Sequence, residues 1–145
     1  EVLTSRSVRL AIMLLLALTL VACGENASSA TGSTQNCRAS ADAGTCQGSM
    51  RTVRGPYNYR IENDILMRDT PVWVHVQLSV ESGAMQVSLT DVDGHTVEAV
   101  ARPGEPVDLE GYSFVGSFES IAVGMHVVEG EEVGGVAYTV TWQAD

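Results

Sequence analysis

Residues 72–90 read VWVHVQLSVESGAMQVSLT, and this stretch decides the fold class. From Val72 to Val80 an aliphatic residue stands at every second position, and the positions between them hold Trp73, His75, Gln77 and Ser79. Successive side chains of a strand point to opposite faces, so the alternation predicts a strand with one apolar and one polar face. Ser82-Gly83 predicts a turn, after which the alternation resumes.

The same alternation recurs in short runs from about residue 51 onward. Asp93-Gly94 predicts a tight hairpin turn, and the acidic stretch 129–132 is expected to form a solvated turn. The runs predict strands at 57–61, 72–80, 85–89, 96–101, 107–109 with a continuation through Phe114, 121–128 and 136–142. About seven strands with polar outer faces favour an all-β fold, an antiparallel β-sandwich of jelly-roll or Ig-like type, with a closed barrel as the alternative.

The N-terminal segment has the composition of a secretory signal peptide. Arg6 and Arg9 precede an apolar run at 10–22, which is too short to span a ~30 Å hydrocarbon core as a helix. Leu20-Val21-Ala22-Cys23 resembles the lipobox of bacterial lipoproteins, in which the cysteine is lipidated and becomes the first mature residue. The resemblance implies a lipid anchor on Cys23 and a location at the cell membrane or, because Gly24 follows, the outer membrane. An ordinary secretory signal is the alternative.

The sequence therefore predicts three parts: a signal peptide at 1–22, a lipidated N-terminus with a tether and a cysteine loop at 23–50, and the sandwich at 51–145. Gly24 to Gln35 has almost nothing to bury, and we expect it to be disordered. Cys37 and Cys46 are predicted to form a disulfide that closes an irregular loop at 36–50. The chain-entropy estimate for such a loop is roughly 2.5 kcal/mol. A metal site is the weaker alternative, because two thiolates without a nearby histidine do not complete a zinc shell.

The charge of the chain excludes some partners. The formal net charge is −10; without residues 1–22, which hold Glu1, Arg6 and Arg9, 17 acids and 6 arginines remain, giving −11. Nucleic acids and anionic lipid surfaces attract basic faces, so neither is an expected ligand of the folded domain. Membrane contact is expected through the lipid anchor.

Motifs for catalysis and cofactors are missing from the sequence. It contains neither G-x-S-x-G nor H-E-x-x-H, so we expect no enzyme activity, no catalytic residues and no cofactor. Asp91 and Asp93, with His95 nearby, could supply oxygen ligands to calcium, but a turn explains these residues more simply, and no metal site is predicted.

Trp73, His75 and Gln77 form the candidate ligand face, because an exposed aromatic ring beside hydrogen-bonding groups suits a sugar or a protein partner. Local packing is the alternative for Trp73, whereas Trp142 is expected in the core, and His75 and His126 are expected to face solvent.

The sequence thus favours a lipid-anchored, extracytoplasmic binding or structural module that contacts an envelope protein or a glycan. Asp91-Val92-Asp93-Gly94 and the run from Ala137 to Trp142 resemble small jelly-roll domains appended to secreted bacterial enzymes. Two alternatives remain: a small carbohydrate-binding module centred on Trp73, and an accessory domain of a secreted hydrolase.

Overall fold

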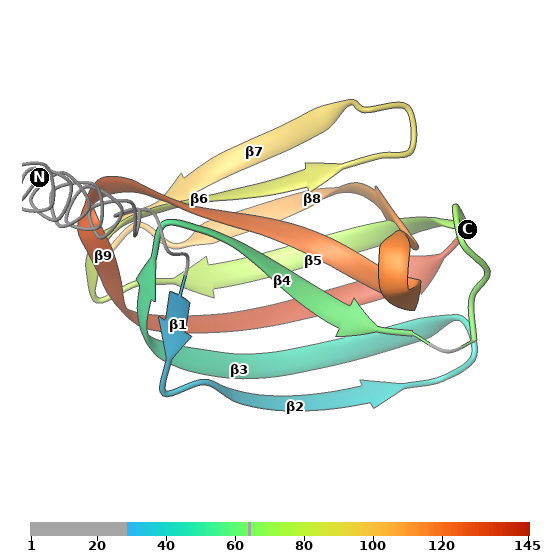
Figure 1. Ribbon diagram of the computed structural model, residues 1–145, viewed down its shortest axis with the longest axis horizontal. Helices are drawn as coiled ribbons and strands as arrows, with labels where there is room; N and C mark the ends of the chain where they lie inside the picture. Colours follow the sequence, from blue (N-terminus) through green and yellow to red (C-terminus); the bar gives the residue numbers. More distant parts are fainter. Residues whose placement is uncertain (1–28, 64) are drawn as a thin grey trace, which may run out of the picture.

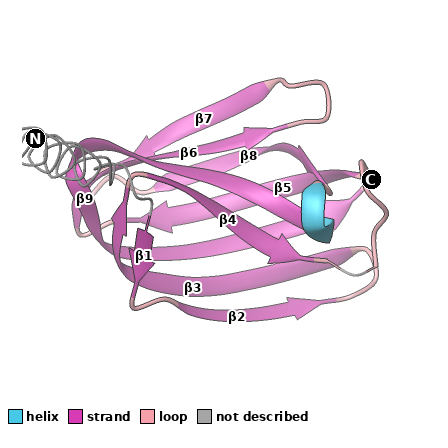
Figure 2. Ribbon diagram, viewed as in Figure 1, coloured by secondary structure: helices cyan, strands magenta, loops and turns pink. Residues whose placement is uncertain are grey.

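The computed structural model describes residues 29–63 and 65–145. The predicted signal peptide, the predicted lipidation of Cys23 and residues 24–28 of the predicted tether lie outside these residues. Figure 2 shows that the described chain is almost entirely strand, with a single-turn 3-10 helix η2 (Ser117–Glu119) among residues 29–63 and 65–145.

The strands run in chain order as β1 (Ser29–Thr31), β2 (Thr34–Ala39), β3 (Ala43–Arg54), β4 (Pro56–Glu62), β5 (Pro71–Ser79), β6 (Ser82–Thr90), β7 (Thr96–Ala101), β8 (Val107–Phe114) and β9 (Ser120–Ala144). Every pair of strands is antiparallel. The predicted all-β antiparallel sandwich is confirmed.

The sheet folds into two layers, and both contain part of β9. In Figure 1 this long strand crosses the molecule in one layer, bends, and runs back in the other. The first part of β9 pairs with β4 and β6, and β6 pairs with β7. The later part, from Val133 onward, pairs with β3 and β5. Beyond these, β3 pairs with β1 and β2, and β5 pairs with β8. We call the second layer, β2-β3-β9-β5-β8, the five-stranded sheet.

The expected acidic turn at 129–132 is wrong, because β9 runs through this stretch as one strand. Gly130 and Gly135 have φ angles of 80° and 61°, in the left-handed region that glycine enters most readily. These two residues let the strand bend where it passes from one layer to the other. The predicted runs at 121–128 and 136–142 are therefore two parts of one element.

The core lies between the two layers and is built from the alternating apolar positions. Val72, Val74, Val76 and Leu78 on β5 are buried, as predicted, and Trp142 is also buried. A strand buried on one face contributes roughly 1.5–3 kcal/mol for each fully buried Val or Leu side chain, so this face alone strongly favours the observed register. The hairpin at Asp93-Gly94 is confirmed, and Gly94 has a φ angle of 86°.

The N-terminal part of the sandwich differs from the prediction. The irregular loop expected at 36–50 is wrong, because this segment forms the antiparallel β2–β3 hairpin, and the disorder expected up to Gln35 is wrong from residue 29 onward. The sandwich therefore includes strands before residue 51, and β3 pairs directly with the central strand β9.

The inward positions of β3 explain why its alternation is hard to see. Gly44 and Gly48 stand opposite Trp142 and Tyr138, whose buried rings fill the space that other side chains would need.

The predicted disulfide is confirmed. Cys37 on β2 and Cys46 on β3 are direct cross-strand partners, with Cα atoms 4.1 Å apart. A structural disulfide is typical of proteins that fold outside the cytoplasm. Among the residues that the structure describes, no helix is both long and apolar enough to cross a membrane.

Candidate functional site

The outward face of the five-stranded sheet carries mainly polar side chains, and we call it the polar face. Its residues alternate with the buried ones on each strand, and the strand registers align them in three rows. The rows are Ala43-Gln143-Trp73-Tyr112, Arg38-Thr45-Thr141-His75-Glu110 and Asn36-Gln47-Thr139-Gln77-Asp108. The predicted ligand residues Trp73, His75 and Gln77 form the β5 column of this array.

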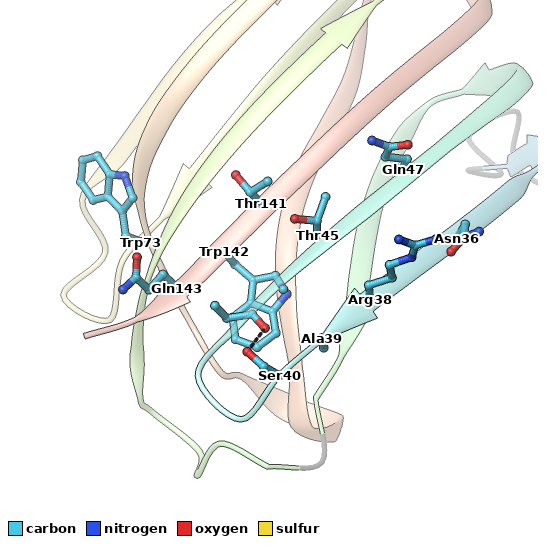
Figure 3. Close-up of a pocket in the computed structure, with 12 residues that line it drawn as sticks. Asn36, Arg38, Ala39, Ser40, Thr45, Gln47, Trp73, Thr141, Trp142 and Gln143 are labelled. Carbon is cyan, nitrogen blue, oxygen red and sulfur yellow. Dashed lines mark hydrogen bonds between the residues drawn. The ribbon is translucent and has the colours of Figure 1, made fainter.

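A groove of about 810 Å³ lies on the polar face. In Figure 3, Trp73 and Gln143 stand at one end, Asn36 and Arg38 stand at the other, and Thr141 and Thr45 lie between them. The groove thus crosses β5, β9, β3 and β2, and its floor is the outer surface of a rigid sheet.

Trp73 is exposed, as predicted, and the ring of Tyr112 packs against it from the neighbouring strand β8. Its side chain is 40% exposed, and that of Tyr112 is 41% exposed. The two rings pack edge to face, with centroids 4.9 Å apart, which is a favourable geometry for an aromatic pair. Tyr112 Oη donates a hydrogen bond to Asp145 Oδ2 at 3.3 Å, and the charge of Asp145 raises the pKa of Tyr112. Local packing by Tyr112 therefore orients Trp73 but leaves much of its ring open.

His75 and Gln77 are both tied to Asp108 on β8. The Nε2 atom of His75 donates to Asp108 Oδ1, and Gln77 Nε2 donates to Asp108 Oδ2 at 3.5 Å. The hydrogen bond from His75, with the second from Gln77, holds the pKa of Asp108 below its usual range. These contacts fix the orientation of the β5 column at the β8 side of the face.

The side chains at the centre of the groove are uncharged, and their hydrogen-bonding groups are open to a ligand. Thr45, Gln47, Thr141 and Gln143 line it, and within residues 29–63 and 65–145 their side chains make no hydrogen bond to the protein. Hydroxyl and amide groups can both donate and accept hydrogen bonds. The central groups can therefore bond a ligand without first breaking contacts inside the protein.

A second depression, of about 530 Å³, continues along the same face. It shares Gln47 with the first groove and extends along Gln77, Thr139 and Ala137. The polar face therefore offers an elongated surface along the strands rather than one closed pocket.

The structure also brings together Asp91, Asp93 and His95, with ligand atoms within 4.8 Å of one another. Asp91 Oδ1 accepts hydrogen bonds from the backbone amides of Asp93 at 2.9 Å and His95 at 2.8 Å, which closes the β6–β7 turn. Desolvation raises the pKa of the Asp91 carboxyl, but the hydrogen bonds from His95 and Asp93 outweigh it and hold this pKa below its usual range. Turn formation accounts for this cluster.

The remaining histidine lies apart from the polar face. His126 is exposed on the first part of β9 and pairs with Pro56 on β4, whereas His75 belongs to the five-stranded sheet. The two expected solvent-facing histidines do not form a common site.

Sequence reasoning missed the part of the groove contributed by β2, β3 and the end of β9. The alternation at 136–142 marks Thr139 and Thr141 as outward, and it extends to Gln143. No pattern, however, shows that β3 and β5 flank that strand, because pairing between segments far apart in the sequence leaves no local signal.

The comparisons with known proteins show no family. No family model matches the chain, and no curated protein matches it.

Several solved structures resemble it weakly. An oxalate oxidase in complex with the substrate analogue glycolate is 12% identical, with a TM-score of 0.40, over 80% of this chain and 53% of that one. An oxalate decarboxylase from Bacillus subtilis is 10% identical, with a TM-score of 0.38, over 82% of this chain and 27% of that one. A protein of Bacillus endospore appendages, described as disulfide-linked pili, is 11% identical, with a TM-score of 0.36, over 85% and 96%. The chain spans about half the length of the oxidase and about a quarter of the decarboxylase.

Proposed function

We propose that this protein is a lipid-anchored module of the cell envelope whose polar face binds another envelope component without catalysing a reaction. The observation that carries the proposal is the open polar groove, in which Thr45, Gln47, Thr141 and Gln143 have uncommitted hydrogen-bonding groups. Rigid sheet faces position such groups well for binding. The lipobox-like sequence ending at Cys23 and the disulfide both support a place outside the cytoplasm.

The proposal assigns no catalytic step to the polar face. In the described part of the chain, His75 bonds Asp108 and His95 bonds Asp91, and no hydroxyl or thiol is hydrogen-bonded to either imidazole. A histidine base activates a nucleophile only within hydrogen-bond reach. The groove therefore supports binding better than acyl or phosphoryl transfer.

The anchor is tested by mass spectrometry of the N-terminal peptide from the natural host. We expect a peptide that begins with Cys23 and carries acyl chains. An unmodified Cys23 still attached to residues 1–22 would refute the anchor.

The binding face is tested by retention of envelope material from detergent-solubilised membranes on the immobilised full chain. Gln47→Arg and Thr141→Arg place a long charged side chain in the groove, whereas His126→Arg makes the same kind of change on the other layer. We expect wild type and His126→Arg to retain the same component, and the groove variants to lose it. Equal retention by all four proteins would show that the polar face is not the binding surface.

A further inference from the structure

We infer, on the basis of the proposed function, that the ligand of the polar face is an uncharged polysaccharide chain that stacks one sugar on Trp73. The inference specifies the chemical class of the ligand and its direction along the sheet. It rests on the charge of the face, on the chemistry of its central groups and on the position of the aromatic pair.

Charge excludes a polyanionic chain. The groove around Thr45, Thr141 and Gln143 has a single formal charge in its lining, that of Arg38 at the β2 side, and Asp108 and Glu110 lie at the β8 side. The chain after residue 22 also carries a net charge of −11, from 17 acids and 6 arginines. A chain of carboxylates or phosphates would meet net repulsion over the whole approach.

The chemistry of the central groups fits sugar hydroxyls. Hydroxyl and amide side chains donate and accept at short range, and so do the hydroxyls of an uncharged sugar. Protein interfaces instead draw their binding energy from central Trp, Tyr and Arg anchors, and Thr is under-represented among them. In this groove the centre is Thr45 and Thr141, and the aromatic rings stand at one end, so the arrangement favours a sugar chain over a protein partner.

Trp73 provides the apolar contact that such a ligand needs. Its ring is 40% exposed and is held by the edge-to-face contact with Tyr112. An aromatic side chain offers a large rigid surface at low conformational cost, and the C–H face of a sugar ring is apolar. Stacking on Trp73 would leave the sugar hydroxyls free for Gln143 and the next row.

The length of the face suits a chain rather than a single sugar. The two depressions together follow β9 from Gln143 to Ala137, a distance of about 20 Å at the ~3.3 Å rise per residue of a strand. Each successive sugar would meet a new row of hydroxyl and amide groups. The inferred ligand therefore lies along the strands, with several sugars in contact.

The test is affinity electrophoresis of the full chain in detergent, through gels that contain one soluble polysaccharide each. The uncharged probes are dextran, glycogen, glucomannan and hydroxyethyl cellulose, and the anionic probes are alginate and polygalacturonate. We expect retardation by at least one uncharged probe, with little dependence on salt, because screening acts on charges. Anionic probes should not retard the protein.

Three variants locate the interaction. Trp73→Ala should weaken the affinity about tenfold, corresponding to ~1.4 kcal/mol, and Trp73→Tyr should recover most of it. Val128→Ala is the matched control, because Val128 is also 40% exposed but lies on the first part of β9. Thermal melts of each variant establish that it is folded, and Thr141→Arg gives a second block of the groove if Trp73→Ala is unstable.

Several outcomes would overturn the inference. They are no retardation by any uncharged probe, retardation by anionic probes alone, or equal effects of Trp73→Ala and Val128→Ala. If those results coincide with loss of an envelope protein by Gln47→Arg in the retention assay, the inference fails while the proposed function stands. If the electrophoresis gives one of these outcomes and the groove variants also retain all the envelope material that wild type retains, the inference and the proposed function both fail.

Discussion

Replacement of Gly44 by alanine should destabilise the protein, although glycine is normally a poor residue for a strand interior. Relative to glycine, alanine stabilises a strand by roughly 0.5–1 kcal/mol when there is room for it. Gly44 has no such room, because a Cβ atom there would lie 2.6 Å from Trp142 Nε1 and 2.7 Å from two carbons of the same indole ring. Real Cβ atoms do not approach other heavy atoms so closely, so the ring or the strand must move.

The magnitude follows from how firmly Trp142 is held. Its ring is buried in the core, and its Nε1 atom has no hydrogen-bond partner among the described residues. Overpacking of a closely packed core costs about 1–3 kcal/mol. After subtraction of the propensity gain, the expected net loss is roughly 0.5–2 kcal/mol, or a fall in melting temperature of about 2–10 °C for a domain of this size.

The assay is thermal and urea denaturation of the full chain, followed by near-UV circular dichroism, which reports on the tryptophans. Gly116→Ala is the matched control, because a Cβ there meets its nearest atoms at 3.6 and 3.7 Å, an ordinary contact. Trp142→Phe should relieve the clash, so the double variant should be more stable than the sum of the two single changes predicts, by about 0.5 kcal/mol or more. A Gly44→Ala protein as stable as wild type, or strict additivity in the cycle, would refute the reasoning.

Three further predictions concern the disulfide and two titrating groups. Replacement of Cys37 and Cys46 by serine should lower the free energy of unfolding by roughly 2.5 kcal/mol, because the disulfide closes a ring with a sequence separation of 9. An unchanged urea midpoint would contradict this. Burial raises the pKa of Tyr59 well above its usual range. The stability that depends on the neutral phenol should therefore be lost as the pH rises above about 10. Spectrophotometric titration should show that Tyr59 ionises only when the protein unfolds. His75→Ala should move the pKa of Asp108 upward toward its ordinary value, as followed by NMR of the carboxyl group, because it removes the principal hydrogen bond that lowers it. That carboxylate's contribution to stability is present above its ordinary pKa and is lost as the pH falls through the lowered one.

The strands β4 to β8 and the two parts of β9 could be predicted because the alternation of each lies within one short segment of the chain. Val72 to Val80 alternates without interruption, and this one run predicts both the buried side of β5 and the outward position of Trp73. The pairing of Cys37 with Cys46 was also accessible, since they are the only cysteines after Cys23. These features depend on side-chain type and spacing alone.

β2 and β3 could not be predicted in the same way. The inward positions Gly44 and Gly48 look like loop residues, and only the partners Trp142 and Tyr138 explain them. Gly44 and Trp142 are 98 positions apart in the sequence, and Gly48 and Tyr138 are 90 apart, so no local window contains both halves of either contact. The acidic stretch at 129–132 was misassigned for a related reason, because bending at Gly130 and a true turn share the same composition.

The sequence by itself determined the periodicity, and with it the all-β class, the apolar core of β5 and the exposure of Trp73. Only the tertiary structure decided that Thr45 and Thr141 stand beside His75 in one row, and that Gln143 stands beside Trp73 in the next. The physical reason is that alternation assigns each residue to a face, whereas neighbours across a sheet are selected by long-range packing and backbone hydrogen bonds. The candidate binding groove is a property of that pairing, and no single segment of the chain contains it.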